Sequence, residues 1–187
     1  IPIINVIKFY ISSEISNING HHYFMAKTDS LASPIWINTF AQSLGDKEHC
    51  IDSEITPDGG LISVGGSMFL MNMYIVKIDM NSNLVWAKAY SDNVGNLMIA
   101  TSIDKTLDGG YIIGGQFTSG PFGLAVPLLM KIDSAGNPIW TKYYGDSNVL
   151  HTFSVTDVIE TSDGSLMMSC VLSSGSFSFV NPVMIKT

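Results

Sequence analysis

The sequence contains no arginine. All nine basic residues among its 187 are lysine, against 16 acidic residues, and the formal charge is −7. Nucleic-acid recognition leans on the bidentate guanidinium group and on a basic surface. The composition therefore argues against a nucleic-acid partner. Charged residues make up only 13% of the chain and hydrophobic residues 46%, which predicts strands buried on both faces, or apolar surface covered by a partner.

Long apolar runs are also missing. No run approaches the ~20 residues that a membrane helix needs, so no membrane span is expected. The apolar opening, residues 1–11, lacks a basic start and a small-residue cleavage site, and is expected to form a strand rather than a signal peptide. Because the chain begins with Ile1 rather than Met, we expect a processed product or a portion of a longer protein.

Cysteine is scarce as well. Cys50 and Cys170 are the two cysteines of the chain, and they supply neither a disulfide framework nor a metal quartet. Both are expected to be buried or half-buried thiols.

A period near 50 residues is the clearest pattern that is present. A Lys-x-Asp motif has its Lys at positions 27, 77 and 131, Lys186 lies at the same spacing, and a Trp follows at 36, 86 and 140. An Asp-Gly motif recurs with its Asp at 58, 108 and 163. Because three markers share one period, we predict a single domain made by tandem duplication. The units are roughly 1–44, 45–94, 95–148 and 149–187.

The residue pattern of each unit predicts short strands separated by turns, and the 3.6-residue periodicity of helices is absent. Asp-Gly between apolar runs is a strong hairpin signal, because Gly adopts the positive φ that the turn requires. The predicted strands are 3–9, 10–15, 23–28 and 34–40 in the first unit, then 51–56, 61–66, 74–78 and 84–90, then 100–106, 111–116, 128–132 and 138–144, and finally 153–160, 166–172 and 183–187.

Four strands in each tandem unit are typical of a β-propeller blade. The expected fold is therefore all-β, a β-propeller or propeller arc of about four four-stranded antiparallel blades. The last unit lacks its outer strand, and the unpaired edge favours continuation of the chain or a covering partner. Glycines in the second strands of the units are expected to let the next blade approach closely, and Cys170 stands at one of these Gly positions.

Two longer segments carry a family resemblance. They are Asp-Gly-Gly-Tyr-Ile-Ile-Gly-Gly at 108–115 and Leu-Met-Lys-Ile-Asp-Ser-Ala-Gly-Asn-Pro-Ile-Trp-Thr-Lys-Tyr-Tyr-Gly-Asp at 129–146. They resemble the tandem DGG / KxDxxGNxxWxKxY repeats of large secreted and cell-surface proteins. The resemblance implies β-propeller architecture, an extracellular or cell-surface location, and a scaffold or adhesion role. The Asp-x-x-Gly-Asn-x-x-Trp element also resembles the tryptophan-docking repeat of quinoprotein dehydrogenases, whose cofactor-binding residues have no counterpart here.

Candidate metal sites have simpler interpretations. The loops that begin at Asp79 and Asp133 resemble oxygen-rich calcium loops, but they lack an anchoring Glu. Asx turns are therefore predicted. His49, Cys50 and Asp52 suggest a zinc cluster, but their spacing matches no zinc motif. The other histidines (His21, His22 and His151) are expected to lie in turns, and no metal or cofactor is predicted.

The first strands offer one positional argument. Six residues before the turn Asp, the three units have Asp52, Ser102 and Asp157. Four residues before it, they have Glu54, Asp104 and Ile159. If the side chains six residues back faced a central axis, they would line a mildly acidic channel able to hold a cation or water. The favoured interpretation is that they face solvent. No catalytic constellation stands out from the sequence.

The leading functional hypothesis is a non-enzymatic structural or interaction module that binds a protein partner or neighbouring copies. The alternative is part of a carbohydrate-active or quinoprotein-like propeller enzyme with its site on one face. Three loops between second and third strands are apolar and aromatic, which suits a contact surface. The predicted interaction residues in these loops are Met68, Phe69, Leu70, Met71, Phe122, Phe177 and Phe179.

Overall fold

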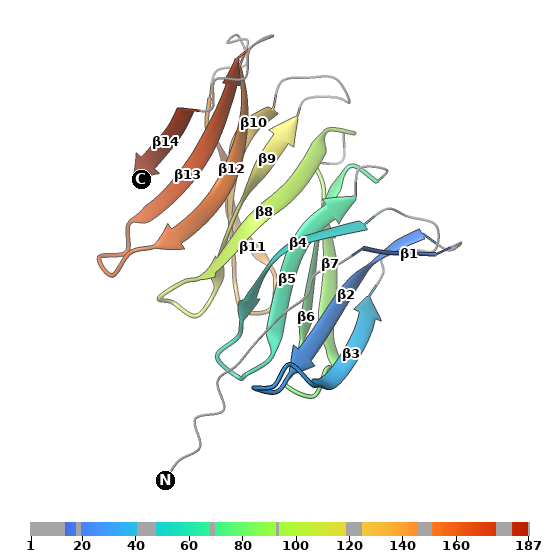
Figure 1. Ribbon diagram of the computed structural model, residues 1–187. Coiled ribbons are helices and arrows are strands. Elements are labelled where there is room, and N and C mark those ends of the chain that lie inside the picture. Colours follow the sequence, from blue (N-terminus) through green and yellow to red (C-terminus); the bar gives the residue numbers. More distant parts are fainter. Residues whose placement is uncertain are drawn as a thin grey trace.

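A computed structural model describes residues 14–17, 20–40, 48–67, 70–92, 94–118, 125–145, 151–174 and 181–186. These residues form strands and turns and contain no helix, so the all-β prediction is confirmed (Figure 1). The predicted interaction residues Met68, Phe69, Phe122, Phe177 and Phe179 lie outside the described residues, as does the predicted strand 3–9.

The strands form four antiparallel sheets, each with its strands in chain order. The first sheet holds β1 (Glu14–Asn17), β2 (Gly20–Thr28) and β3 (Pro34–Phe40). The second holds β4 (Glu48–Ile55), β5 (Leu61–Ser67), β6 (Asn72–Ile78) and β7 (Leu84–Tyr90). The third holds β8 (Leu97–Lys105), β9 (Tyr111–Thr118), β10 (Ala125–Ile132) and β11 (Pro138–Tyr143). The fourth holds β12 (His151–Glu160), β13 (Leu166–Ser174) and β14 (Asn181–Lys186).

The Asp-Gly motifs form the predicted hairpin turns. In the second sheet, the Gly59 N–H donates to the carbonyl of Thr56 at 2.9 Å, and Gly59 has a φ of 80°. Gly109 and Gly164 repeat both features, with φ of 84° and 80°. A side chain at these positions would be strained, which explains why Gly follows the turn Asp each time.

β-Bulges also recur at equivalent places. The pairing of first and second strands shifts register between Cys50 and Asp52, between Ala100 and Ser102, and between Val155 and Asp157. A bulge leaves one residue unpaired and redirects its neighbours. The side chains just after these bulges are the ones that meet the next sheet, as described below.

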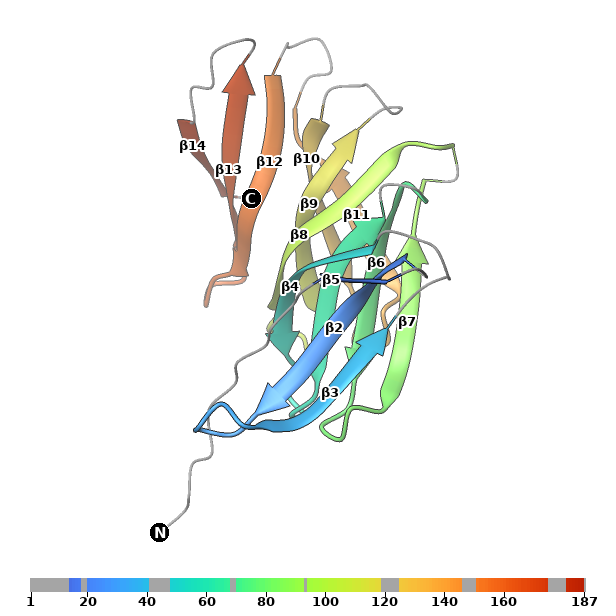
Figure 2. The same ribbon diagram turned by 45° about the vertical axis from the view of Figure 1, so that its right-hand side comes forward.

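The four sheets lie side by side in chain order, as both views show (Figures 1 and 2). The first strand of a following sheet crosses the preceding sheet. Thus β8 contacts β4, β5 and β6, and β12 contacts β8, β9 and β10. We call the side of a sheet that meets the next one its forward face.

The core consists of three apolar clusters, one between each pair of consecutive sheets. Their members include Tyr23, Met25 and Tyr74, then Tyr90, Met73 and Tyr111, then Ile112, Leu129 and Met168. A Cβ placed at Gly114 would lie 2.7 Å from Cγ1 of Val155 on the fourth sheet. The prediction that second-strand glycines allow the next sheet to approach closely is confirmed at this position.

Candidate interaction surface

Side chains just after the β-bulges bind the main chain of the next sheet. In the second sheet, Asp52 Oδ2 accepts a hydrogen bond of 2.9 Å from the N–H of Ile103. In the third, Ser102 Oγ accepts one of 3.3 Å from the N–H of Val158. The Ser102 hydroxyl also donates to Asp157 at 3.1 Å. An equivalent side chain therefore satisfies an equivalent N–H group at both boundaries.

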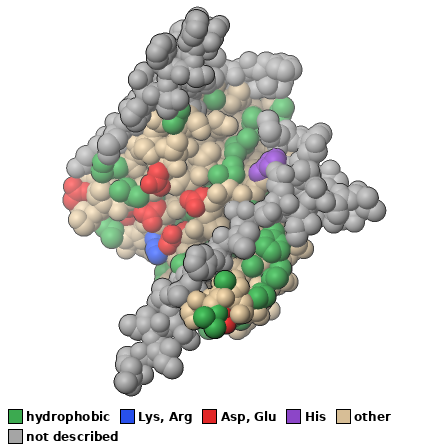
Figure 3. Space-filling model, in the orientation of Figure 1, with side chains coloured by type: hydrophobic (Ala, Val, Ile, Leu, Met, Phe, Trp, Pro, Cys, Tyr) green, Lys and Arg blue, Asp and Glu red, His purple; other side chains and the backbone are tan. Residues whose placement is uncertain are grey.

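A second pair of contacts lies two residues further along. Glu54 forms a 2.5 Å ion pair with Lys105 of the next sheet. At the following boundary, Asp104 Oδ2 accepts a 3.4 Å hydrogen bond from the N–H of Glu160. Acidic side chains gather on this face over β8 and β12, as Figure 3 shows. The acidic residues of the first strands thus serve as contacts between sheets.

These contacts correct the sequence interpretation. Solvent-facing side chains were favoured at these positions, yet Ser102 is only 2% exposed and Asp52 and Asp104 are half-buried. For the second and third sheets the prediction was wrong, because strand alternation shows which residues share a face, but not whether another sheet covers that face. For the fourth sheet it holds, since Asp157 and Ile159 are exposed.

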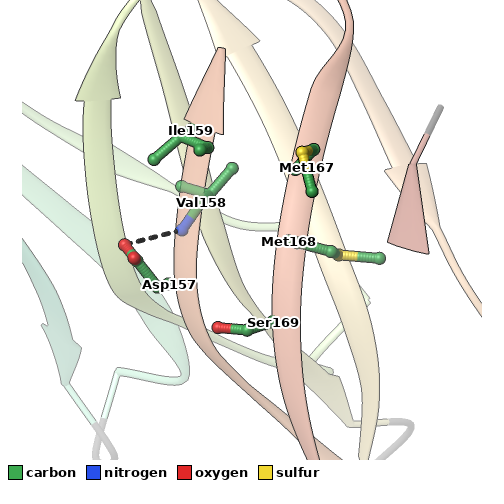
Figure 4. A pocket seen from close by; sticks show the side chains of 6 residues that line it. All are labelled: Asp157, Val158, Ile159, Met167, Met168 and Ser169. Atoms are coloured by element: carbon green, nitrogen blue, oxygen red, sulfur yellow. Dashed lines mark hydrogen bonds between the residues drawn. The ribbon is translucent and has the colours of Figure 1, made fainter. Parts of the chain in front are cut away.

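The fourth sheet presents the same positions differently. Asp157 and Ile159 are exposed, the latter at 43%, and Met167 and Ser169 are half-buried. Together with Val158 and Met168 they line a shallow pocket of about 90 Å³ (Figure 4). Met167 corresponds to Ile62 and Ile112, which lie at 0% exposure beneath the next sheet. The pocket therefore lies on the forward face of the fourth sheet.

The Lys-x-Asp turns are Asx turns, as predicted. Asp133 Oδ1 accepts hydrogen bonds from the N–H groups of Ala135 at 2.9 Å and Asn137 at 2.7 Å. Asp79 makes the equivalent bonds to Asn81 and Asn83, both at 2.8 Å. The Asn side chains also donate to these carboxylates. Hydrogen bonds to the charged form lower the pKa of both Asp79 and Asp133.

Each of these turns also rests on the sheet before it. The turn at residues 133–137 contacts β7, where Lys88 Nζ donates to the carbonyl of Ala135 at 2.8 Å and to Asn137 Oδ1 at 3.0 Å. Tyr90 OH donates to the carbonyl of Gly136 at 2.7 Å. Sequence reasoning missed these contacts, although position 88 has counterparts at 38 and 142 on the same period.

The remaining sequence candidates are dispersed. His49 and Cys50 are half-buried on β4. The prediction that His21, His22 and His151 lie in turns was wrong, because β2 begins at Gly20 and β12 at His151, before the predicted starts at 23 and 153. Within the described residues, no three His, Cys, Asp or Glu side chains form a group that could hold a metal ion.

The two thiols behave as predicted. Cys170 is buried and Cys50 is half-buried, and both are free. Burial raises the pKa of Cys50 to about 11 and also raises the pKa of Cys170, so neither thiol is activated as a nucleophile at neutral pH.

Leu70 and Met71 represent the predicted interaction loops in the described part of the chain. Leu70 is 45% exposed, and its N–H donates to Ser67 Oγ at 3.0 Å. Met71 has a φ of 52°, and its carbonyl accepts from the N–H of Met98 on the next sheet at 3.4 Å. The exposed Leu70 suits a contact role, which stays a prediction.

Asp108 gives the protein a pH dependence that can be tested. Lys131 Nζ lies 2.7 Å from its carboxylate, and the Thr106 hydroxyl donates to it at 2.6 Å. These contacts lower the pKa of Asp108 from 3.8 to about 2. A carboxyl whose pKa is lower in the folded state adds stability above its unfolded pKa, and this stability is lost as pH falls. We expect the free energy of unfolding to decline between about pH 4 and pH 2.

The pH measurement is urea unfolding at a series of pH values, together with an NMR titration of the Asp108 carboxyl. Asp108→Asn should flatten part of the decline. The contribution is modest because the Asp108 side chain is 55% exposed. An Asp108 pKa near 3.8 in the NMR titration would contradict the expectation.

No protein-family model matches the sequence, and no curated protein matches it. Among the described residues, no helix has both the length and the apolar character needed to cross a membrane. The fold is similar to the crystal structure of a protein of unknown function from Bacteroides caccae, with a TM-score of 0.50 and 10% sequence identity. The match covers 87% of this chain and 55% of that chain, so this chain spans about half the length of its structural neighbour. Likeness at this identity concerns the all-β fold alone.

Proposed function

We propose that the chain is a non-enzymatic structural and interaction module, an arc of β-propeller blades of the DGG / KxDxxGNxxWxKxY repeat type. The proposal includes an extracellular or cell-surface location, which rests on the sequence resemblance. The recurrence of turns, bulges and inter-sheet contacts at equivalent positions supports tandem duplication. Consecutive packing of four antiparallel sheets supports the propeller arc.

One observation carries the functional part of the proposal. The second and third sheets bind their successors through equivalent side chains, Asp52 and Ser102, which accept main-chain N–H groups. The acidic residues that could have served a propeller enzyme are engaged in such contacts, which favours a module over an enzyme. On the fourth sheet, Asp157, Ile159 and Met167 occupy the equivalent forward positions and line the pocket.

The partner proposed for this forward face is another β-sheet, from a neighbouring copy or from a second protein. Its first strand would offer a main-chain N–H to Asp157 and apolar side chains to Met167. Fully burying an aliphatic or Met side chain contributes about 1.5–3 kcal/mol, so Met167 and Ile159 provide an apolar centre. Asp157 contributes to the register, because its carboxylate can accept one further N–H group in addition to the hydrogen bonds from Ser102 and Val158.

The test extends the chain with its own sequence. Lys186 corresponds to Lys131, so residues that follow Thr187 continue the repeat if they copy the chain from Asp133 onward. A short extension copies residues 133–145 and supplies a turn and one strand. A long extension copies residues 133–187 and supplies a further sheet as well. We expect the long form to unfold cooperatively and to exceed the short form by about 2 kcal/mol or more in unfolding free energy.

Two substitutions sharpen this test. Met167→Glu in the original unit should remove the advantage of the long extension and leave the short extension unaffected. Met80→Glu is the matched control, because Met80 is 55% exposed in the turn at residues 79–83. Equal stability of the two extended forms, or separate unfolding of the added sheet, would overturn the proposal.

A further inference from the structure

The last strands of the first two sheets, β3 and β7, each hold the turn of the next sheet. On β7, the turn at residues 133–137 lies over Trp86, since a Cβ placed at Gly136 would be 2.9 Å from Cη2 of that ring. Gly136 has a φ of 77°, which favours Gly for the backbone as well. Lys88 Nζ lies 5.6 Å from the centre of the Trp86 ring and binds the turn from the side. The turn therefore makes an apolar contact with the Trp86 ring and polar contacts with the Lys88 ammonium group.

The boundary between the first and second sheets repeats this arrangement. Asn38 on β3 stands where Lys88 stands on β7, and its side chain donates to the carbonyl and the hydroxyl of Ser82. Ser82 occupies the position of Gly136 in its turn, has a φ of 69° and is 7% exposed. The turns at residues 79–83 and 133–137 are therefore both bound by a side chain at the same position of the preceding sheet, which is Asn38 in one case and Lys88 in the other.

A third site of this kind exists on β11. Trp140 and Lys142 occupy the positions of Trp86 and Lys88, and Lys142 Nζ lies 5.2 Å from the centre of the Trp140 ring. Lys142 is exposed. In the described part of the chain, no carbonyl group accepts a hydrogen bond from its ammonium group. The distance from the ammonium group to the ring is similar to that of the occupied pair Trp86 and Lys88, but no turn among the described residues covers this pair.

The edge of the fourth sheet complements this site. Its strand order within the described residues is β12-β13-β14, so β14 is the edge strand. The equivalent strands β6 and β10 pair on that side with β7 and β11, and the turn that rests on the preceding sheet joins each pair. An edge strand with free main-chain groups is a template for an added strand.

We propose that the β14 edge and the Trp140–Lys142 pair together form a binding site for a peptide segment in which an Asp-x-x-Gly-Asn turn leads into a β-strand. The strand adds to β14 in antiparallel pairing. The turn rests on the Trp140 ring through its Gly, and its carbonyl groups accept hydrogen bonds from Lys142. This inference rests on the proposed function as an interaction module, and it names the chemistry of one partner segment.

The test uses the full chain and a synthetic peptide with the sequence of residues 133–145, labelled at its carboxyl end. Fluorescence anisotropy should show saturable binding. Hydrogen exchange of the amides in β14 should slow when the peptide is bound, because they gain strand partners. A peptide with Gly136→Val should bind at least about tenfold more weakly, since its side chain would collide with the Trp ring. A peptide with Ser134→Ala keeps the turn and serves as the positive control.

Variants of the chain locate the site. Lys142→Ala should weaken binding about tenfold through lost hydrogen bonds to the turn. Lys27→Ala, a half-buried lysine on β2 of the first sheet, is the matched control and should leave binding unchanged. Absence of binding, equal binding of the Gly136→Val peptide, or no effect of Lys142→Ala would each overturn the proposal. Met167→Glu should not affect peptide binding, because Met167 lies on the forward face and not at the β14 edge. A result that contradicts the peptide site can therefore be told apart from one that contradicts the proposed function.

Discussion

Gly115→Ala is expected to lower the free energy of unfolding by about 3 kcal/mol or more. A Cβ at this position would lie 2.3 Å from the carbonyl oxygen of Ile99 on the neighbouring strand β8. That oxygen belongs to the main chain, so it cannot move aside as a side chain does. Relief of the collision would disturb the pairing of β8 with β9 next to the bulge at residues 100–102.

Urea unfolding followed by circular dichroism measures the effect of Gly115→Ala. Gly95→Ala is the control, because nothing lies within 4 Å of a Cβ at Gly95, whose φ is 83°. The control reports the cost of a positive φ alone, about 1 kcal/mol. A loss for Gly115→Ala no larger than that cost would show that the collision at Gly115 is unimportant.

Trp86→Ala is expected to destabilise the protein by about 3 kcal/mol, and Trp140→Ala by about half as much. Trp86 packs against the core cluster between the second and third sheets and is also covered by the turn at Gly136. Trp140 packs against the next cluster, but no turn among the described residues covers it. The cavity left by truncation is therefore more enclosed at position 86.

The same unfolding experiment compares the two tryptophan variants. The peptide of residues 133–145 adds a second comparison, because it should stabilise the parent chain and not Trp140→Ala. If Trp140→Ala cost as much as Trp86→Ala, the two rings would be equally enclosed, and the asymmetry described here would be wrong.

Local sequence chemistry was enough to predict most strands. The bounds of β3 and β7 match the predicted ranges 34–40 and 84–90, because a polar Asx turn precedes each strand and fixes its start. The Asp-Gly hairpins were predictable for the same reason. Each depends on one residue that must adopt a positive φ, and that requirement is visible in the sequence.

The starts of the first strands were predicted less well. β4 begins at Glu48 and β8 at Leu97, three residues before the predicted starts at 51 and 100. A β-bulge lies at residues 50–52 of β4 and at residues 100–102 of β8, next to the predicted starts, and shifts the alternation of side chains. Residues before the bulge therefore fall out of phase with the pattern that identifies the rest of the strand.

Polar contacts between sheets could not be predicted from the sequence. Asp52 and Ser102 accept N–H groups from residues 51 and 56 positions later. An Asp or Ser at these positions could equally face solvent, line a channel or make such a contact. The contact of Lys88 was equally hard to predict, since its partner is a main-chain carbonyl in the turn at residues 133–137. Every residue has such a carbonyl, so the sequence does not indicate which one is bound.

The use of main-chain donors at each boundary has a consequence for how such a chain can change in evolution. Asp52 and Ser102 bind an N–H group that any residue except proline provides. A gene that gained or lost one whole unit through unequal recombination would bring a new pair of sheets together, and the hydrogen bond at their boundary would form without a compensating mutation. The number of units can thus change before any side chain adapts to its new neighbour. Later substitutions then need to improve only the apolar contacts.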